Sequence, residues 1–195
     1  IILALIGVYR IADIVMGVMA NVFYTDLGFS KEEIAAVSKT FGLFMTIGGS
    51  FLGGVLSVRY GVVKILFLGA LLSAITNILF AFMAQLGPNT EMFIVVIMAD
   101  NLSGGLATAA FIAYLSGLTN ISFTAMQYAI FSSIMTLFPK ILAGFSGTVV
   151  DAVGYSWFFV GTAVIGIPVL WLVVLAGRMT DTKDTTKPDA SAQDA

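Results

Sequence analysis

Six long apolar stretches, separated by short polar connections, account for most of this chain. They cover about 1–25, 32–58, 62–86, 92–118, 124–150 and 156–178. Each stretch has about the 20 or more residues that an α-helix needs to cross the hydrocarbon core of a bilayer. The pattern predicts an all-α membrane protein in which six transmembrane helices form one domain over residues 1–178.

The connections carry the signals expected at helix ends. Ser30 stands three residues before Glu33, which is the spacing of a capping box at the start of the second helix. A tight joint at 59–61 ends in glycine and separates the second helix from the third. After residue 178 the composition turns polar, with too little apolar surface to fold, so 179–195 is predicted to be a disordered cytoplasmic tail.

Composition supports a membrane location and excludes several classes of function. Apolar residues make up 59% of the chain and charged residues 10%, against about 45–50% and about 25% in soluble domains. The net charge is -2 without a basic cluster, so nucleic acid is excluded as a partner. The chain has no Cys and no His, so disulfides, thiol nucleophiles and His-based zinc sites are excluded. We expect a lipid bilayer as the environment, and neither metal nor cofactor.

Basic residues gather in the connections on one side of the predicted bundle. Arg59 and Lys64 flank the joint between the second and third helices, and 178–187 holds three more basic residues. Lys31 is the basic residue found in the connections of the opposite side. Because cytoplasmic loops carry the excess of Lys and Arg, both ends of the chain are expected to be cytoplasmic.

Five ionisable residues lie inside the apolar stretches, where a charge costs about 2.5–3.5 kcal/mol to insert. They are Arg10, Asp13, Lys39, Asp100 and Lys140. Such residues are expected to face a cavity or a partner. One alternative is that Arg10 and Asp13 neutralise each other and fix helix packing, but that accounts for two of the five. Three cations against two acids leave a surplus positive charge, which favours an anionic substrate.

The charged positions divide the helices into two groups. The first, second, fourth and fifth stretches carry intramembrane charges on faces of three- and four-residue spacing, whereas the third and sixth carry none. We therefore expect the first group to line a cavity and the third and sixth helices to be outer, lipid-facing supports. Gly49 and Gly53 in the second stretch are expected to allow close helix packing.

Several motifs resemble known transporters. Gly54-Val-Leu-Ser-Val-Arg59-Tyr-Gly61-Val-Val-Lys64 resembles the G-x-L-x-D-R-x-G-R-K signature loop of the major facilitator superfamily, with Val58 and Val62 replacing an acidic and a basic position. Phe23 to Lys39, Asp100 to Phe111 and Asn120 to Ala129 resemble the muropeptide permease (AmpG-like) family. The likeness runs from about residue 8 to 175. Asp100 stands where that family more often has Glu, and Pro139-Lys140 where it often has Gly-Arg.

The resemblance implies an architecture and an activity. The chain would be the carboxy-terminal half of a major facilitator fold, built as two inverted three-helix repeats, and would pair with a missing amino-terminal six-helix half. It would sit in the bacterial inner membrane. Relatives of this kind import anhydro-muropeptides, which are anionic sugar-peptides, together with protons, for peptidoglycan recycling.

Candidate roles follow for the polar residues. Proton coupling is assigned to Asp13 first and Asp100 second, because a carboxyl group in a low-dielectric cavity can hold a proton near neutral pH. The cationic side chains are expected to attract carboxylates of the substrate, and three polar residues to hydrogen-bond its sugar or peptide groups. These candidates are Arg10, Lys39 and Lys140, and Asn21, Asn101 and Tyr114; the signature-loop residues are Gly54, Arg59, Gly61 and Lys64.

Other functions remain open from the sequence. A related carrier could move a different anion such as acetyl-coenzyme A, and the same fold could serve as a scaffold that transports nothing. Gly144-Phe-Ser146-Gly147 matches the G-x-S-G of rhomboid-like proteases, but such a serine needs a His base that the chain lacks. Neither Asp13 nor Asp100 lies in the G-x-G-D context of intramembrane aspartyl proteases. An enzyme is not expected.

Overall fold

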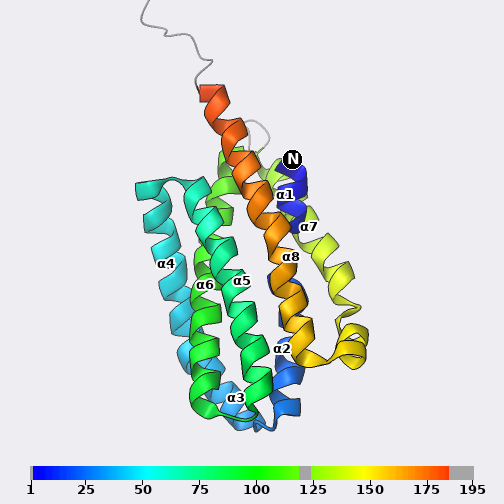
Figure 1. Ribbon diagram of the computed structural model, residues 1–195. Coiled ribbons are helices and arrows are strands. Elements are labelled where there is room, and N and C mark those ends of the chain that lie inside the picture. Colours follow the sequence, from blue (N-terminus) through cyan, green and yellow to red (C-terminus); the bar gives the residue numbers. More distant parts are fainter. Residues whose placement is uncertain (1, 119–123, 185–195) are drawn as a thin grey trace, which may run out of the picture.

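The described part of the chain is a bundle of helices without strands. The computed structural model describes residues 2–118 and 124–184, and its helices run roughly along one axis (Figure 1). They are α1 (Ile2–Val8), α2 (Ile11–Leu27), α3 (Lys31–Val37), the π-helix η1 (Ser38–Gly42), α4 (Leu43–Tyr60), α5 (Val62–Leu86), α6 (Thr90–Leu118), α7 (Thr124–Ala143) and α8 (Ser146–Asp184).

Five spans within the described residues are long and apolar enough to cross a membrane. They are Ile2–Leu27, Lys31–Tyr60, Val62–Leu86, Thr90–Leu118 and Ser146–Arg178. The remaining helix, α7, occupies the place expected for a fifth crossing and has 20 residues. Polar residues such as Gln127, Ser132 and Lys140 lower its mean hydropathy. The predicted all-α membrane architecture is confirmed.

The predicted start of the second helix is confirmed. The backbone N–H of Ser30 donates to Glu33 Oε2 at 2.9 Å, and the backbone N–H of Glu33 donates to Ser30 Oγ at 3.2 Å. Both halves of the capping box are therefore present. The joint that ends α4 turns at Gly61, whose φ of 93° lies in the region where a residue with Cβ is strained.

The first predicted helix is interrupted. α1 ends at Val8 and α2 begins at Ile11, with Arg10 in a non-helical conformation (φ -97°, ψ 8°). Gly7 lies in the last turn of α1, and no proline lies near this break. Tertiary contacts accompany it, because the Tyr9 hydroxyl donates to the carbonyl O of Leu66 at 2.9 Å, and the Tyr9 ring stacks on Phe111.

The last two predicted helices have different bounds in the structure. α7 ends at Ala143 instead of continuing to residue 150, and α8 starts at Ser146 and kinks at Gly154 (φ 80°, ψ 165°). α8 then continues to Asp184, so 179–184, which were predicted to belong to the disordered tail, are helical. Residues 185–195 of that predicted tail lie outside the described residues.

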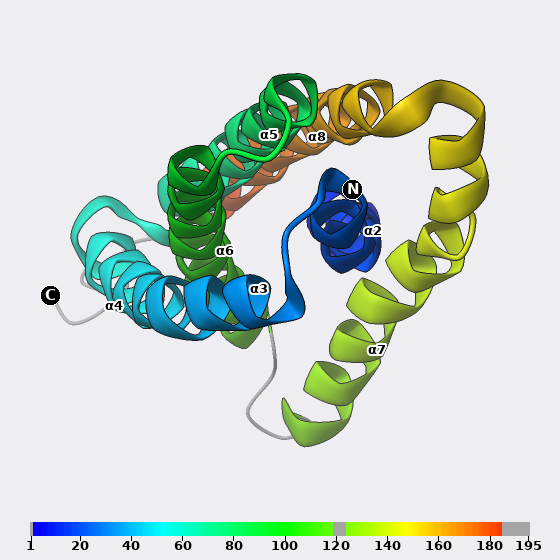
Figure 2. The same cartoon turned by 90° about the horizontal axis from the view of Figure 1, so that it is seen from below.

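The packing order places α5 in a more central position than the sequence indicated. α4 packs on α6, α5 packs on both α6 and α8, and α2 contacts α5, α7 and α8. Viewed along the bundle, α4, α6, α5 and α8 form a curved row around α2 (Figure 2). One side of α5 is exposed at Ile75, Ile78 and Phe82, as expected of a lipid-facing helix. Its other side is buried and mostly apolar, but it includes Ser73, Thr76 and Asn77.

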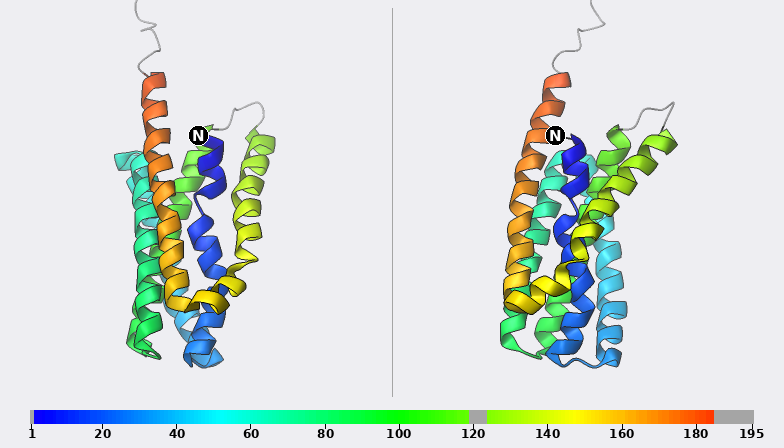
Figure 3. Two further views of the ribbon diagram at one scale, coloured as in Figure 1. Left: turned by 45° about the vertical axis from the view of Figure 1, so that its right-hand side comes forward. Right: turned by 90° about the vertical axis from the view of Figure 1, so that its right-hand side faces the viewer.

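Both ends of the described chain lie at the same end of the bundle. The start of α1 and the end of α8 lie on the side where α4 joins α5 (Figures 1 and 3). The α2–α3 and α5–α6 connections lie at the opposite end. The joint at 59–61 and the end of α8, both chosen for basic side chains, therefore share one side of the molecule.

Candidate functional site

A polar cavity of about 290 Å³ lies between α2, α4 and α6. Three- and four-residue spacing brings the side chains of each helix to this space. From α2 and its preceding residue come Arg10, Asp13, Met16, Gly17 and Ala20; from α4, Thr46 and Ser50; and from α6, Asp100, Asn101, Gly104, Gly105 and Thr108. Four of the predicted site residues, Arg10, Asp13, Asp100 and Asn101, thus meet in one place.

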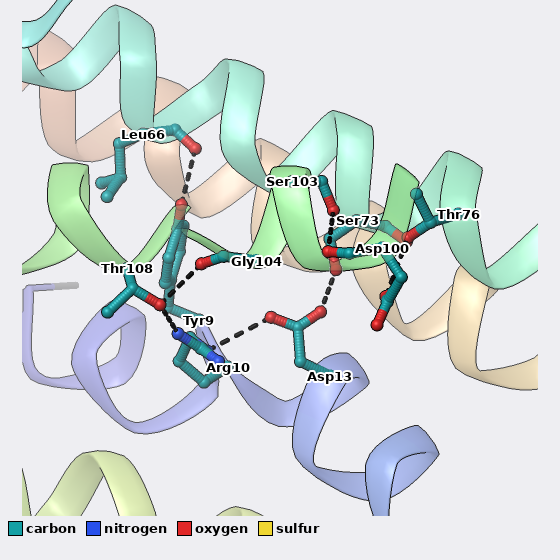
Figure 4. Close-up of polar contacts among 10 residues, drawn as sticks. All are labelled: Tyr9, Arg10, Asp13, Leu66, Ser73, Thr76, Asp100, Ser103, Gly104 and Thr108. Atoms are coloured by element: carbon teal, nitrogen blue, oxygen red, sulfur yellow. Dashed lines mark hydrogen bonds and ion pairs between the residues drawn. The ribbon is translucent and has the colours of Figure 1, made fainter. Parts of the chain in front are cut away.

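Arg10 and Asp13 form an ion pair at the start of α2. Arg10 Nε lies 3.2 Å from Asp13 Oδ2, and the two side chains are 23% and 17% exposed. The Nε–H group is not aligned for a hydrogen bond, so distance alone defines the pair. Arg10 Nη1 donates to Thr108 Oγ1, which in turn donates to the carbonyl O of Gly104 at 2.6 Å (Figure 4). Arg10 thereby links α2 to α6.

The two acids are held by hydroxyl groups of α5. Ser73 Oγ donates to Asp13 Oδ1, and Thr76 Oγ1 lies 3.4 Å from Asp100 Oδ1 (Figure 4). Both hydroxyl residues are buried, at 6% and 4% exposure. Within the described residues, no cation lies within ion-pair distance of Asp100. The two carboxyl groups therefore differ: Asp13 is paired with a cation and Asp100 is not.

The charge balance of this cavity differs from the balance expected from the sequence. Its lining contains one cation, Arg10, and two acids. The expected surplus of positive charge is wrong for this site, because Lys39 and Lys140 are exposed elsewhere. With both acids ionised the lining would carry one net negative charge, and with one proton bound it is neutral. Like charges in a low-dielectric site favour the state in which one acid holds a proton.

Asn21 and Lys39 form a separate group. Together with Thr25 and Lys31 they line a groove of about 320 Å³ between α2 and the α3–η1 segment. Lys39 lies in the π-helix η1, a type of helix that is frequent at functional sites. The groove is separate from the cavity, since the two share no lining residue.

The other predicted residues lie outside both spaces. Lys140 is exposed on α7, and Tyr114 is buried beside Val62 and Val63 with no hydrogen-bond partner for its hydroxyl. In the signature loop, Gly54, Arg59, Gly61 and Lys64 are exposed. The Arg59 guanidinium lies 5.4 Å from the centre of the Tyr60 ring, a cation–π contact.

Sequence reasoning missed the residues of α5. Ser73 and Thr76 carry no charge, and the stretch was assigned to the lipid-facing periphery because it lacked ionisable residues. A signal was present, because Ser73, Thr76 and Asn77 recur at three- and four-residue spacing within an otherwise apolar helix. In lipid such hydroxyl and amide groups are expected to find partners on neighbouring helices.

Comparison with known proteins shows the family of this chain. The family profile described as Major Facilitator Superfamily matches residues 1–194. Three similar relatives bear the name AmpG. AmpG 4 of Rickettsia conorii is 30% identical over 166 residues, 85% of this chain and 40% of that protein. AmpG 1 of Rickettsia bellii is 34% identical over 89% of this chain and 42% of its own length. AmpG 3 of Rickettsia prowazekii is 31% identical over 81% of this chain and 38% of its own.

The matches cover most of this chain but less than half of each relative. The chain spans about two-fifths of the length of the curated relatives that it matches. The superfamily profile matches nearly all of the chain, and the helices of the described residues have the length and hydropathy of membrane crossings. This chain belongs to the major facilitator superfamily of membrane transporters and is similar to its AmpG members.

Proposed function

We propose that this chain forms part of a secondary active importer that moves anhydro-muropeptides into the cytoplasm together with protons. The cavity that brings one cation and two carboxyl groups together carries this proposal. The cargo follows from the AmpG names of the relatives and from the resemblance of the motifs to muropeptide permeases.

Asp100 is the better proton carrier of the two acids. Among the described residues, its side chain has one hydrogen-bond contact, the Thr76 hydroxyl at 3.4 Å, and no cation lies within ion-pair distance of it. Asp13, in contrast, accepts a hydrogen bond from Ser73 and is paired with Arg10. We therefore place Asp100 before Asp13 as the proton carrier, the opposite of the order expected from the sequence. Asp13 becomes the partner that holds Arg10 until a substrate anion or a change at Asp100 releases it.

The basic groove offers a contact for the anionic cargo. Lys31 and Lys39 line it beside Asn21, which can hydrogen-bond a sugar or peptide group. Asn101 lines the cavity, but its amide is occupied: Nδ2 donates to the carbonyl O of Ile97 at 2.8 Å, and Oδ1 accepts from Thr46 at 3.0 Å. Lys140 on α7 is a third exposed cation. Tyr114 lies away from these spaces and is left out of the proposed cargo contacts.

The test is uptake into proteoliposomes that contain the complete gene product. Labelled anhydro-muropeptide should accumulate when the lumen is alkaline, with proton entry followed by a trapped pH dye. Asp100→Asn should lower this accumulation by about tenfold or more and retain exchange of labelled for unlabelled cargo. Asp151→Asn, at an exposed acid outside the cavity, is the matched control. Unchanged accumulation in Asp100→Asn would remove that residue from the mechanism.

The same preparation separates the two cargo candidates. Excess unlabelled anhydro-muropeptide should compete with the label, whereas acetyl-coenzyme A should not. The opposite result assigns the carrier to another anion. Failure of both compounds to bind or move favours the scaffold function.

We further propose that the chain lies in a bacterial inner membrane with both ends cytoplasmic and packs against a second six-helix half. The basic joint at 59–61 lies at the same end of the bundle as the start of α1 and the end of α8, as the positive-inside rule requires of a cytoplasmic side. Because the chain has no Cys, a single cysteine at Arg59 or at Glu91 can be labelled selectively in whole cells. Labelling of the Arg59 position by an impermeant reagent from outside would contradict this orientation.

A further inference from the structure

The Thr76 hydroxyl faces two acceptors but has one hydrogen. Its Oγ1 lies 2.9 Å from the carbonyl O of Ser73 and 3.4 Å from Asp100 Oδ1. A backbone carbonyl only accepts hydrogen bonds, and so does an ionised carboxylate, whereas a protonated carboxyl group also donates. If Asp100 is ionised, the two contacts compete for one hydrogen, which either serves one acceptor or is shared between them. If Asp100 carries a proton, both contacts are satisfied, because Asp100 donates to Thr76 and Thr76 donates to Ser73.

Thr108, on the facing helix, shows what a consistent pair of contacts looks like. Its hydroxyl donates to the carbonyl O of Gly104 and accepts from Arg10 Nη1, so each contact contains a hydrogen. Thr76 has a comparable pair of contacts within α5, to the carbonyl three residues before it and to a carboxyl group in the place of the guanidinium. The contact becomes equivalent to that of Thr108 when Asp100 is the donor. The arrangement therefore fits the proton-bound state of the site.

The same turn of α5 holds the other acid. Ser73 accepts at its carbonyl from Thr76, and its own hydroxyl donates to Asp13 Oδ1 (Figure 4). This chain of contacts is not a route for protons, because the backbone carbonyl of Ser73 has no hydrogen to pass on. It is a mechanical connection. When the Thr76 hydroxyl changes direction, the carbonyl of Ser73 gains or loses a hydrogen bond, and Ser73 is the residue that positions Asp13.

Few ionisable groups surround Asp100. Asp13 and Arg10 act on it electrostatically from the α2 side, and Asp100 in turn acts on the buried phenol of Tyr24. The helices packed against α6 present uncharged groups to the cavity, from Thr46 and Ser50 of α4. The charged residues of these neighbouring helices are exposed: Lys39 on η1, Arg59 on α4, Lys64 on α5 and Lys140 on α7.

We propose that Thr76 is a positioning residue that couples the protonation state of Asp100 to the Arg10–Asp13 pair. While Asp100 holds a proton, Thr76 donates to Ser73 and the turn that holds Asp13 is fixed. When the proton leaves, the Thr76 hydroxyl rotates to donate to Asp100 Oδ1, and the Ser73 carbonyl loses that bond. The inference rests on the proposed role of Asp100 as proton carrier. It adds Thr76, an uncharged residue, to the residues involved in proton coupling.

The test compares Thr76→Val with Thr162→Val in the complete gene product. Thr162 is the matched control: it is buried and donates to the carbonyl O of Phe159 at 2.8 Å, within one helix and away from any carboxyl group of the cavity. The infrared band of the protonated carboxyl group is followed as the pH is raised, and the band of Asp100 is identified by its loss in Asp100→Asn. Thr76→Ser keeps the hydroxyl and should behave as the parent protein.

The expected result has a definite sign. Thr76→Val removes the hydroxyl that donates to ionised Asp100 and accepts from protonated Asp100. Because the hydrogen bond to the charged form is the stronger of the two, the band should persist to higher pH by about one unit, a roughly tenfold change. The alkaline limb of cargo uptake should move in the same direction, with Thr162→Val unchanged. Thr76→Ala is measured alongside, so that a misfolded Val variant does not decide the outcome.

Two results overturn the inference. In the first, the titration of the carboxyl band in Thr76→Val or Thr76→Ala coincides with that in Thr162→Val. The other is a Thr76→Ser variant that shifts as far as Thr76→Val, which would assign the effect to packing of the methyl groups. The infrared titration needs no transport, so it separates a failure of this inference from a failure of the proposed import function.

Discussion

The contact between α4 and α6 predicts a sharp difference between two neighbouring glycines. A Cβ atom added at Gly49 would lie 2.1 Å from the carbonyl O of Leu102, whereas one added at Gly48 would meet nothing within 4 Å. The clash at Gly49 is with backbone, which cannot rotate away. The two helices would have to separate by about 1 Å to restore ordinary van der Waals contact, a distortion of the overpacking kind that costs about 1–3 kcal/mol.

The substitution at Gly48 is expected to act in the opposite direction. Alanine favours a helix over glycine by about 1 kcal/mol, and Gly48→Ala should gain part of that. With a cost near 2 kcal/mol, Gly49→Ala should lower the unfolding temperature in detergent by roughly 4–8 °C. Fluorescence-detected gel filtration after heating measures both variants. Equal melting temperatures for the two would refute the claim that α4 and α6 meet backbone to backbone.

Two further predictions concern residues at the edge of the cavity and in the groove. Tyr9→Phe keeps the ring stacked on Phe111 but loses the hydrogen bond to Leu66, so the free energy of unfolding should fall by about 1 kcal/mol. Tyr60→Phe, at an exposed ring, should leave it unchanged. Equal thermal unfolding curves for the two variants would count against the hydrogen bond. Lys39→Gln should raise the KM for anionic cargo about threefold to tenfold with kcat retained and with Lys39→Arg near the parent value. A KM that responds equally to both substitutions would show that charge is not the cause.

The sequence was informative where local chemistry determines the structure. The Ser30–Glu33 capping box and the turn at Gly61 formed as expected, because each depends on residues within a few positions. The close approach expected at Gly49 and Gly53 was also confirmed, since added Cβ atoms at both would meet the backbone of α6.

Features that depend on partners far along the chain were not predictable in this way. The break beside Arg10 accompanies contacts to Leu66, Thr108 and Phe111, which lie more than 50 residues away in sequence. The roles of Ser73 and Thr76 depend on which acids face them across the helix interface. Charge identified the acids, but the uncharged side chains that distinguish Asp13 from Asp100 became apparent only when α5 was placed beside α2 and α6.

The interruption between α1 and α2 also determines which parts can move independently. α1 rests on α7 and α8, and α2 rests on α5, α7 and α8. A continuous helix of this length would tilt as one rod, whereas two half-helices joined at Tyr9 and Arg10 can tilt by different angles. Spin labels on α1 and α2, each paired with one on α6, would measure this. If the two segments do tilt separately, Arg10 sits at the pivot, where a small rotation swings its guanidinium from one partner to another.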